Sequence, residues 1–326
     1  MPTPNRFKFV MLPPQSAITR DWAAKLAAQV PEARVVVAED ADTAAREIAD
    51  AEAAFGRLPR ELLAKGTKLR WLQAPQAAPP AGYYYPELIA HDVAVTNFRE
   101  IYNDHISAHI MAFVLAFARG LHVYIPQQLR HEWKKPAEDL GVLHLPDATM
   151  LIVGVGGIGA ETARLASAFG ITVLATDARR TDAPPGVAEL HKPEALDTLL
   201  PRADVVVLTV PHTPATEGFF NRARFQRMKR SGFFINIGRG MTTKLDDLVA
   251  ALRAGEIAGA ALDVYEQEPL PAEHPLWGMP NVMLTPHMAG YGPYLNDRRF
   301  EIIVENCQAF AAGRPLRNVV DKGMWF

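Results

Sequence analysis

The stretch TMLIVGVGGIGAETARLASAFGITVLATD, residues 149–177, decides the fold of this 326-residue chain. It opens with an apolar run, passes through a cluster of glycines, continues with apolar residues at helical spacing and closes with a second β-rich run. A strand, a turn, a helix and a second strand in this order form a βαβ unit, which places two parallel strands in one sheet. The stretch therefore predicts a parallel sheet covered by helices.

The glycines of this stretch follow the G-x-G-x-x-G spacing at Gly154, Gly156 and Gly159. In such a turn the first glycine permits the tight bend, the second lets the backbone approach a pyrophosphate, and the third lets the helix pack closely on the strand. The phosphate then lies at the helix N-terminus. Because a strand and a helix flank the glycines in register, we predict a dinucleotide site rather than an ordinary turn.

The segment TDARR, residues 176–180, decides which dinucleotide fits. Asp177 stands where an acidic side chain accepts a hydrogen bond from the ribose 2′-OH, and a carboxylate there repels a 2′-phosphate. Arg179 and Arg180 favour the opposite outcome, because guanidinium groups hold phosphate, although Arg179 also fits the role of stacking on adenine. We expect NAD, with NADP as the alternative.

Strand and helix patterns alternate over the rest of the chain as well. β-rich runs lie at residues 7–12, 33–38, 51–57, 68–74, 204–210, 233–238, 259–264 and 282–286, and helical patterns lie at 16–30, 59–66, 224–232, 245–257 and 294–314. Such alternation predicts parallel sheets with helices on both faces. The apolar segment 103–133 predicts a long helix, capped by Asn103 or Asp104 and broken at Pro126, that packs against another domain or subunit.

The amino-acid composition and the net charge indicate which class of partner the protein binds. With 49% hydrophobic and 21% charged residues the chain is typical of a soluble globular protein. The net charge of −2 gives no basic field for a nucleic acid, so we expect a small-molecule partner. Cys307 is the only cysteine and no apolar run reaches about 18 residues, so we expect a cytoplasmic protein that neither forms intrachain disulfides nor spans a membrane.

Polar residues follow three of the predicted strands: Arg239, then Asp263 and Glu268, then His287. The carboxyl ends of strands in a doubly wound sheet form the ligand crevice, so these residues are expected to converge. An arginine binds a substrate carboxylate, a histidine donates a proton to a forming alkoxide, and a carboxylate orients that histidine. Each residue alone is ordinary, but together behind a dinucleotide motif they predict hydride transfer to a 2-oxo acid.

The chain resembles the D-isomer-specific 2-hydroxyacid dehydrogenase family. The resemblance rests on the motifs GVGGIG, PHTPATEGFFN, MKRSGFFINIGRG, GAALDVYEQEPLP and HPLWGMPNVMLTPHMAG. It implies two doubly wound parallel-sheet domains: a flavodoxin-like substrate-binding domain from residues 1–103 and 295–326, and an inserted Rossmann NAD(P)-binding domain from residues 104–294. It also implies a homodimer, with the helix near 104–120 as hinge and dimer contact.

The resemblance assigns roles to individual residues. It implies that Arg239 binds substrate, that Glu268 rather than Glu266 pairs with the catalytic His287, and that Asp263 lies near the nicotinamide carboxamide. His212 either touches cofactor or substrate, or packs. The remaining residues implied to line the cofactor are Gly157, Ile158, Val210, Pro211, Ile237 and Gly238.

Two segments depart from the family pattern. Where the family presents backbone N–H groups to the substrate carboxylate, this chain has QAAPPAGYYY, residues 76–85, and its prolines have no N–H to donate. Gln76, Ala77 and Ala78 remain as donors, while the tyrosines either admit a bulky 2-oxo acid or pack. In SAHIMAF, residues 107–113, His109 replaces an acidic residue of the family, and we assign it no catalytic role.

A metal site and two other functions are the alternatives to this one. The histidines of residues 105–144 lack the acidic or cysteine partners of a zinc site, so we expect no metal. A formate- or phosphite-dehydrogenase-like enzyme and a non-catalytic, NAD-sensing corepressor-like protein remain alternatives on the same fold. The joint presence of Arg239, Glu268 and His287 favours the 2-oxo acid reductase.

Overall fold

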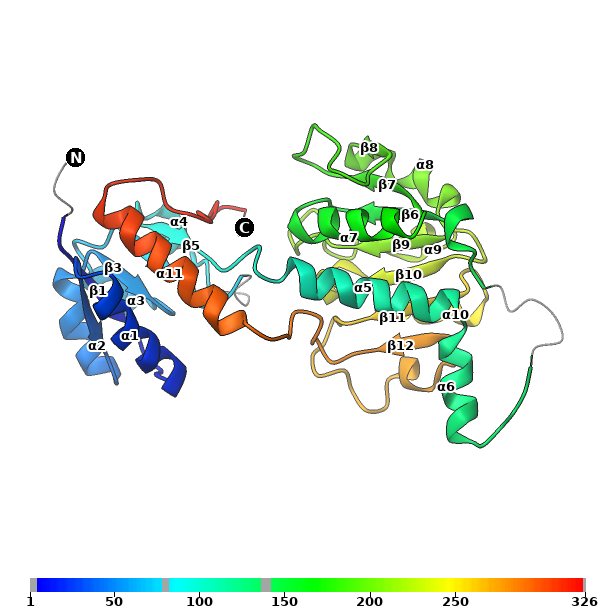
Figure 1. Ribbon diagram of the computed structural model, residues 1–326, viewed down its shortest axis with the longest axis horizontal. Coiled ribbons are helices and arrows are strands. Elements are labelled where there is room, and N and C mark those ends of the chain that lie inside the picture. Colours follow the sequence, from blue (N-terminus) through cyan, green and yellow to red (C-terminus); the bar gives the residue numbers. More distant parts are fainter. Residues whose placement is uncertain (1–4, 78–81, 136–141, 325–326) are drawn as a thin grey trace. The chain divides into compact units, whose positions relative to one another are not determined.

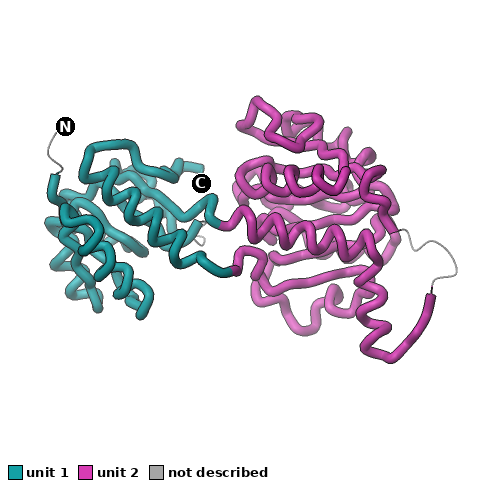
Figure 2. Tube along the Cα trace, viewed as in Figure 1, with its two compact units in different colours: residues 1–101, 293–326 teal, residues 102–292 magenta. Residues whose placement is uncertain are grey.

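The computed structural model describes residues 5–77, 82–135 and 142–324. It divides into two compact units: unit 1, Met1–Ile101 with Pro293–Phe326, and unit 2, Tyr102–Gly292 (Figure 2). Each division falls two residues before the boundary predicted from the sequence, at 101/102 rather than 103/104 and at 292/293 rather than 294/295. Unit 1 is therefore built from both ends of the chain, and unit 2 is inserted between them.

Unit 1 contains a five-stranded parallel sheet in the order β2-β1-β3-β4-β5 (Figure 1). Its strands are β1 (Phe7–Met11), β2 (Ala33–Val37), β3 (Ala53–Phe55), β4 (Trp71–Gln73) and β5 (Ala94–Thr96). Its helices are α1 (Ala17–Gln29), α2 (Ala41–Glu47), α3 (Arg60–Lys65), α4 (Pro86–Ala90) and α11 (Leu295–Ala311), with a 3₁₀ turn η1 (Ile48–Asp50). This strand order is the flavodoxin-like one, as predicted.

The C-terminal segment completes unit 1. Helix α11 packs beside α1, which begins at a capping box formed by Ser16. On α11 the ring of Phe310 lies 5.6 Å from Trp71 of β4 and 4.8 Å from Phe7 of β1, measured between ring centres. The backbone N–H of Val320 donates to the carbonyl of Val95 in β5. The C-terminal segment thus completes the hydrophobic core of unit 1, to which residues 5–77 and 82–101 also contribute.

Unit 2 contains a seven-stranded parallel sheet in the order β12-β11-β10-β9-β6-β7-β8. Its strands are β6 (Thr149–Val153), β7 (Thr172–Thr176), β8 (Glu189–His191), β9 (Val205–Leu208), β10 (Phe233–Asn236), β11 (Gly259–Leu262) and β12 (Val282–Leu284). Its helices are α5 (Asn103–Ala118), α6 (Leu121–Leu129), α7 (Gly157–Ala168), α8 (Leu196–Leu199), α9 (Arg222–Phe225) and α10 (Leu245–Arg253). Shorter 3₁₀ turns are η2 (Leu145–Asp147), η3 (Pro193–Ala195), η4 (Leu200–Arg202), η5 (Gly240–Thr242) and η6 (Pro275–Gly278). The order changes direction between β6 and β9, which makes this the Rossmann arrangement predicted from the glycine motif.

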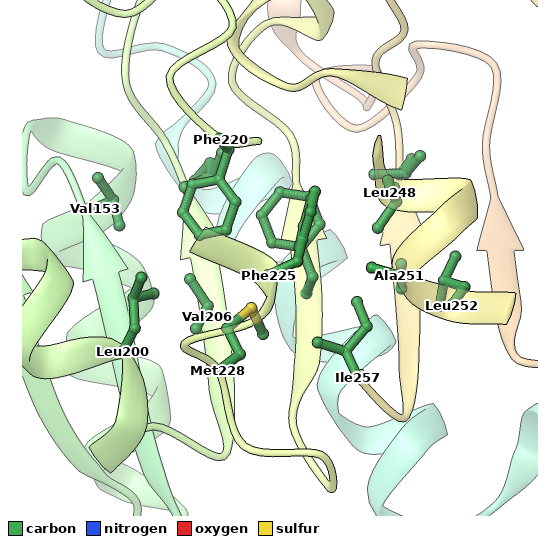
Figure 3. Close-up of a cluster of buried hydrophobic side chains, with 14 of the residues drawn as sticks. Val153, Leu200, Val206, Phe220, Phe225, Met228, Leu248, Ala251, Leu252 and Ile257 are labelled. Atoms are coloured by element: carbon green, nitrogen blue, oxygen red, sulfur yellow. The ribbon is translucent and has the colours of Figure 1, made fainter. Parts of the chain in front are cut away.

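The sheet of unit 2 is buried on both faces. One face packs against α8, α9 and α10 around a cluster that includes Phe220 and Phe225 (Figure 3). The other face packs against α5 and α7, where Phe117 of α5 stacks on Phe233 of β10 with ring centres 4.3 Å apart. Burial on both faces explains why β6, β9 and β10 read as continuous apolar runs rather than alternating ones.

The single long helix predicted over 103–133 is two helices in the structure, α5 and α6. It breaks at Gly120, whose left-handed φ of +66° ends α5, while Pro126 lies inside α6. The predicted caps are also wrong, because α5 begins at Asn103 and the N-cap position belongs to Tyr102. Among the described residues no single helix is long and apolar enough to cross a membrane, and α5 with α6 pass that test only as a pair bent by 76°.

Candidate active site

The turn after β10 presents Arg239. Asn236, at the end of the strand, is fully buried; its Oδ1 accepts from the N–H of Gly238 at 3.0 Å and its Nδ2 donates to the carbonyl of Arg239 at 3.1 Å. A Cβ on Gly240 would lie 1.8 Å from the carbonyl oxygen of Tyr265, so only glycine lets the turns after β10 and β11 approach so closely. The turn that carries Arg239 is therefore held against the one that leads to Glu268.

Arg239 is a half-buried cation beside that second turn. Its Nη1 donates to the carbonyl of Gly238 at 2.6 Å. Burial lowers the pKa of the Arg239 guanidinium, and the negative charge of Glu268 opposes that change. A guanidinium remains charged even when it is buried, and the other N–H groups of Arg239 can donate to a second partner. Arg239 therefore suits an anionic ligand.

Glu268 and His287 form a hydrogen-bonded pair. The Nδ1 atom of His287 lies 2.7 Å from Oε2 of Glu268, and Oε1 of Glu268 accepts from the N–H of Tyr265 at 3.0 Å. The side chain of His287 is half exposed, and its backbone has the left-handed φ of +51°, which is uncommon outside glycine. With Nδ1 facing Glu268, the Nε2 atom is left for a ligand.

Asp263, at the end of β11, is buried and supports the segment that carries His287. Its Oδ1 accepts from the hydroxyl of Thr285 at 2.6 Å and from the N–H of Met288 at 2.8 Å, and its Oδ2 accepts from the N–H of Ala289 at 2.9 Å. One carboxylate therefore binds the chain on both sides of His287. The sequence predicted Asp263 as a site residue but not in this role, and it did not predict Asn236, Tyr265 and Thr285 as supports.

The glycine turn after β6 has the geometry expected of a phosphate site. Gly154 has a φ of +94°, and a Cβ on Gly159 would lie 2.1 Å from the carbonyl oxygen of Gly154. At Gly156, the N-cap of α7, a Cβ would meet no described atom within 4 Å. The backbone there is open at a helix N-terminus, and such a position suits a pyrophosphate.

The turns after β6, β9 and β10 adjoin one another in unit 2. A Cβ on Gly154 would lie 2.9 Å from Cγ1 of Val210, and one on Gly238 would lie 2.6 Å from the carbonyl oxygen of Val210. Beside them Ile237 is buried, Ile158 is partly buried, and Gly157 and Pro211 are exposed. His212 extends to the surface, where its Nε2 lies 3.4 Å from Oε2 of Glu217.

Asp177, at the end of β7, binds its own loop. Its Oδ2 accepts from the N–H of Val155 at 2.9 Å, and its Oδ1 accepts from the N–H groups of Arg179 and Arg180 at 2.9 and 2.8 Å. Burial raises the pKa of Asp177, but the bonds from Arg180, Arg179 and Val155 lower it by more, so the net shift is downward. The carboxylate is a fixed negative charge beside the glycine turn, with two arginine side chains on the same loop.

In unit 1 the described part of the predicted substrate loop follows β4. Gln76 is exposed, and the carbonyl of Ala77 accepts from Nδ2 of Asn97 at 2.8 Å. Ala78, like Pro79 and Pro80, lies outside the described residues.

The three tyrosines of the loop are buried in the core of unit 1. The hydroxyls of Tyr83 and Tyr85 donate to the carbonyls of Gly56 and Leu58, both at 2.9 Å. Burial raises the pKa of Tyr84 and of Tyr85 to about 12. Of the two alternatives for these side chains, packing is therefore the one that the structure supports.

No group of three or more His, Cys, Asp or Glu side chains in the described parts of the chain is arranged to hold a metal ion.

Comparison with known proteins gives one family. Residues 111–289 match the family model described as D-isomer specific 2-hydroxyacid dehydrogenase, NAD binding domain. A glyoxylate reductase of Thermofilum pendens is 34% identical over 73% of this chain and 70% of its own length.

Solved structures match over nearly the whole chain. A D-isomer specific 2-hydroxyacid dehydrogenase of Xanthobacter autotrophicus, in complex with NADPH, is 29% identical with a TM-score of 0.84 over 98% of this chain and 100% of that one. An NADPH-dependent glyoxylate/hydroxypyruvate reductase of Sinorhizobium meliloti, in complex with NADP, is 27% identical with a TM-score of 0.80 over the same shares.

Proposed function

The chain belongs to the D-isomer specific 2-hydroxyacid dehydrogenase family of NAD(P)-dependent oxidoreductases, and from that premise we propose that it interconverts a small 2-oxo acid and the 2-hydroxy acid. The observation that carries the proposal is the pairing of His287 with Glu268 at 2.7 Å, beside the half-buried cation of Arg239. These three residues supply a proton, an orienting charge and a carboxylate-binding group.

His287 is the general acid of the reduction. The nicotinamide, when bound, supplies the hydride that reaches C2 of the substrate. His287 donates the proton of Nε2 to the oxygen of the forming alkoxide, and Glu268 stabilises the protonated ring through Nδ1. In the oxidation of a 2-hydroxy acid the same nitrogen accepts the proton.

Arg239 binds the carboxylate of the substrate. The guanidinium offers paired donors that match a carboxylate, and its charge also polarises a neighbouring ketone. Because the turn of Arg239 is tied to Asn236 and packed on the backbone of Tyr265, the side chain starts from a fixed position beside Glu268.

We assign dinucleotide binding to unit 2 and substrate binding to unit 1, through the backbone of Gln76, Ala77 and Ala78. The open backbone at Gly156 supports a pyrophosphate on α7. Further cofactor contacts are proposed for the residues that line the adjoining turns: Gly154, Gly157, Ile158, Gly159, Val210, Pro211, His212, Ile237, Gly238 and Asp263.

NAD is the proposed cofactor, with NADP as the alternative. The fixed negative charge of Asp177 supports NAD, since it repels a 2′-phosphate. Arg179 and Arg180 on the same loop support NADP, as do the relatives solved with NADPH or NADP.

The proposed substrate is a small acid such as glyoxylate or hydroxypyruvate. The tyrosines that would have admitted a bulky side chain are packed in the core of unit 1. Relatives that are 34% and 35% identical to this chain are named glyoxylate reductase and glyoxylate/hydroxypyruvate reductase A.

We propose a cytoplasmic homodimer. Leu121, Ile125 and Leu129 lie four residues apart along α6, so they share one face of the helix, and they are 43%, 53% and 77% exposed. An apolar stripe of this kind supports contact with a second copy of the chain. Sedimentation of the purified protein tests the assembly.

Initial rates of NADH and NADPH oxidation with glyoxylate, hydroxypyruvate and phenylpyruvate test the activity. Turnover of the two small acids is expected, with phenylpyruvate slower. Cofactor binding without turnover of any 2-oxo acid would instead support the corepressor-like alternative.

A further inference from the structure

A histidine on α5 contacts the segment that carries His287. His109 is partly buried, and its ring meets that of Phe113 edge-on with centres 4.6 Å apart. Its Nε2 lies 3.0 Å from the hydroxyl oxygen of Thr285. Thr285 in turn lies 2.6 Å from Oδ1 of Asp263. All of these residues belong to unit 2.

The direction of each bond in this series follows from the chemistry of the groups. The carboxylate of Asp263 accepts three hydrogen bonds and has none to donate, so the hydroxyl proton of Thr285 points to Asp263. A threonine hydroxyl has one proton, so toward His109 the oxygen of Thr285 acts as acceptor. His109 must therefore carry a proton on Nε2.

The burial of His109 also determines the protonation state of its ring. Burial lowers the pKa of His109, and the negative charge of Asp263 opposes that change. At neutral pH the ring is then neutral and has one N–H, which the bond to Thr285 places on Nε2. The Nδ1 atom is unprotonated in this form.

The series of hydrogen bonds from His109 through Thr285 to Asp263 ends at the backbone on either side of His287. Asp263 accepts from Thr285, two residues before His287, and from the N–H groups of Met288 and Ala289, which follow it. His287 itself has a left-handed backbone, which persists only where neighbouring contacts maintain it. Three of those contacts converge on the carboxylate of Asp263, whose charge the donated proton of Thr285 partly offsets.

We propose that His109 is a positioning residue, which fixes the hydroxyl of Thr285 against Asp263 and so maintains the direction in which His287 presents Nε2. The proposal rests on the proposed function of His287 as proton donor. It gives a role to a residue that stands where the family commonly has an acid. His109 touches neither substrate nor the reacting atoms in this role.

His109→Phe and His109→Gln separate the hydrogen bond from the packing. Phenylalanine keeps a ring beside Phe113 but has no Nε2 proton, whereas the glutamine amide has a donor that reaches a similar position. His109→Phe is expected to lower kcat about tenfold with KM for both substrates unchanged, because only the transition-state position of His287 is disturbed. His109→Gln is expected to stay within about threefold of the wild type.

Thr285→Val and its combination with His109→Phe test whether the two residues act through one path. If they do, the double variant is no slower than Thr285→Val alone. His122→Phe is the matched control, since His122 also packs edge-on against a phenylalanine, Phe117, with ring centres 5.1 Å apart. It should leave kcat unchanged.

A nitrogen-15 NMR measurement of the histidine rings tests the same proposal without turnover. His109 is expected to be protonated on Nε2 in the wild type, and His109→Phe, but not His122→Phe, is expected to shift the ring signals of His287. Protonation on Nδ1, unshifted His287 signals, unchanged kcat in His109→Phe, or equal losses in the Phe and Gln variants would each overturn the proposal. A wild type with the expected NMR signals but no turnover of any 2-oxo acid would overturn only the proposed function.

Discussion

The imidazole of His287 and the carboxylate of Glu268 meet at 2.7 Å, and the remaining oxygen of Glu268 accepts from the backbone N–H of Tyr265. The glutamate is thus fixed from two sides, by a ring on one turn and by the backbone of another. Because Nδ1 of His287 binds this carboxylate, Nε2 is the ring nitrogen that faces away from Glu268.

Removing the proton donor should abolish most of the activity while leaving the fold and the cofactor site in place. We expect His287→Gln to lower kcat by roughly 10²–10⁴-fold, the range of general acid catalysis, with the Kd for NADH unchanged. Stopped-flow or steady-state rates, together with fluorescence titration of NADH, check both parts. Turnover close to that of the wild type would show that another group donates the proton.

Changing the orienting carboxylate should act through the histidine. In Glu268→Gln the amide lacks the charge that stabilises a protonated ring, so kcat is expected to fall by roughly 10²-fold or more, while KM changes little. Glu266→Gln is the matched control, because Glu266 accepts instead from the N–H of Leu245 at 2.7 Å. Similar losses in the two variants would contradict the pairing of Glu268 with His287.

Arg239→Lys keeps the charge but loses the paired donors. We expect kcat/KM for the 2-oxo acid to fall about 10- to 100-fold, since hydrogen bonds to charged groups contribute about 1.5–3 kcal/mol. Steady-state rates over a range of acid concentrations give this ratio. An unchanged KM and kcat would mean that another group binds the carboxylate.

The glycine turn offers a test that separates folding from cofactor binding. Gly156→Ala meets no described atom within 4 Å, so the protein should fold normally, but the added methyl occupies the space a pyrophosphate needs. Gly159→Ala places its Cβ 2.1 Å from the carbonyl oxygen of Gly154 and should lower stability, by about 1–3 kcal/mol. Thermal unfolding and NADH titration of both variants give the comparison, and equal NADH affinity in Gly156→Ala and the wild type would place the pyrophosphate elsewhere.

Asp177 should also influence stability in acid. Its pKa is lowered in the folded protein, so its contribution is fully present above about pH 4, the ordinary value, and is lost as the pH falls through the lowered value. Asp177→Asn should therefore lose less stability than the wild type between about pH 5 and pH 2. Urea unfolding at several pH values measures this, and parallel curves for the two proteins would refute it.

Sequence patterns predicted the strands of both sheet centres well, because strands buried on both faces are continuous apolar runs. The edge strands β5 and β8 were missed. Both contain partly exposed residues, so they lack the fully buried apolar pattern of β3 and β4, which are also three residues long. The break at Gly120 was placed at Pro126 because the sequence does not reveal which of two helix-breaking residues adopts the decisive backbone angle.

In the site, the groups that we propose to face a ligand were easier to predict than the groups that support them. Arg239, Glu268 and His287 stand out as polar residues after apolar strands. Asn236 and Thr285 are small polar residues whose importance depends on contacts with chain segments that the sequence does not place beside them. A polar residue that ends a buried strand, as Asn236 does, is the one signal that was present in advance.

The insertion of unit 2 into unit 1 has a consequence for the order of events on the ribosome. Residues 102–292 are continuous, so this unit has all of its strands as soon as it has been synthesised. The five strands of unit 1 precede unit 2 in the chain, but α11, which supplies Phe310 beside Trp71, follows it. Unit 1, whose strands precede unit 2 in the chain, therefore completes its core only after the whole of unit 2 has been synthesised.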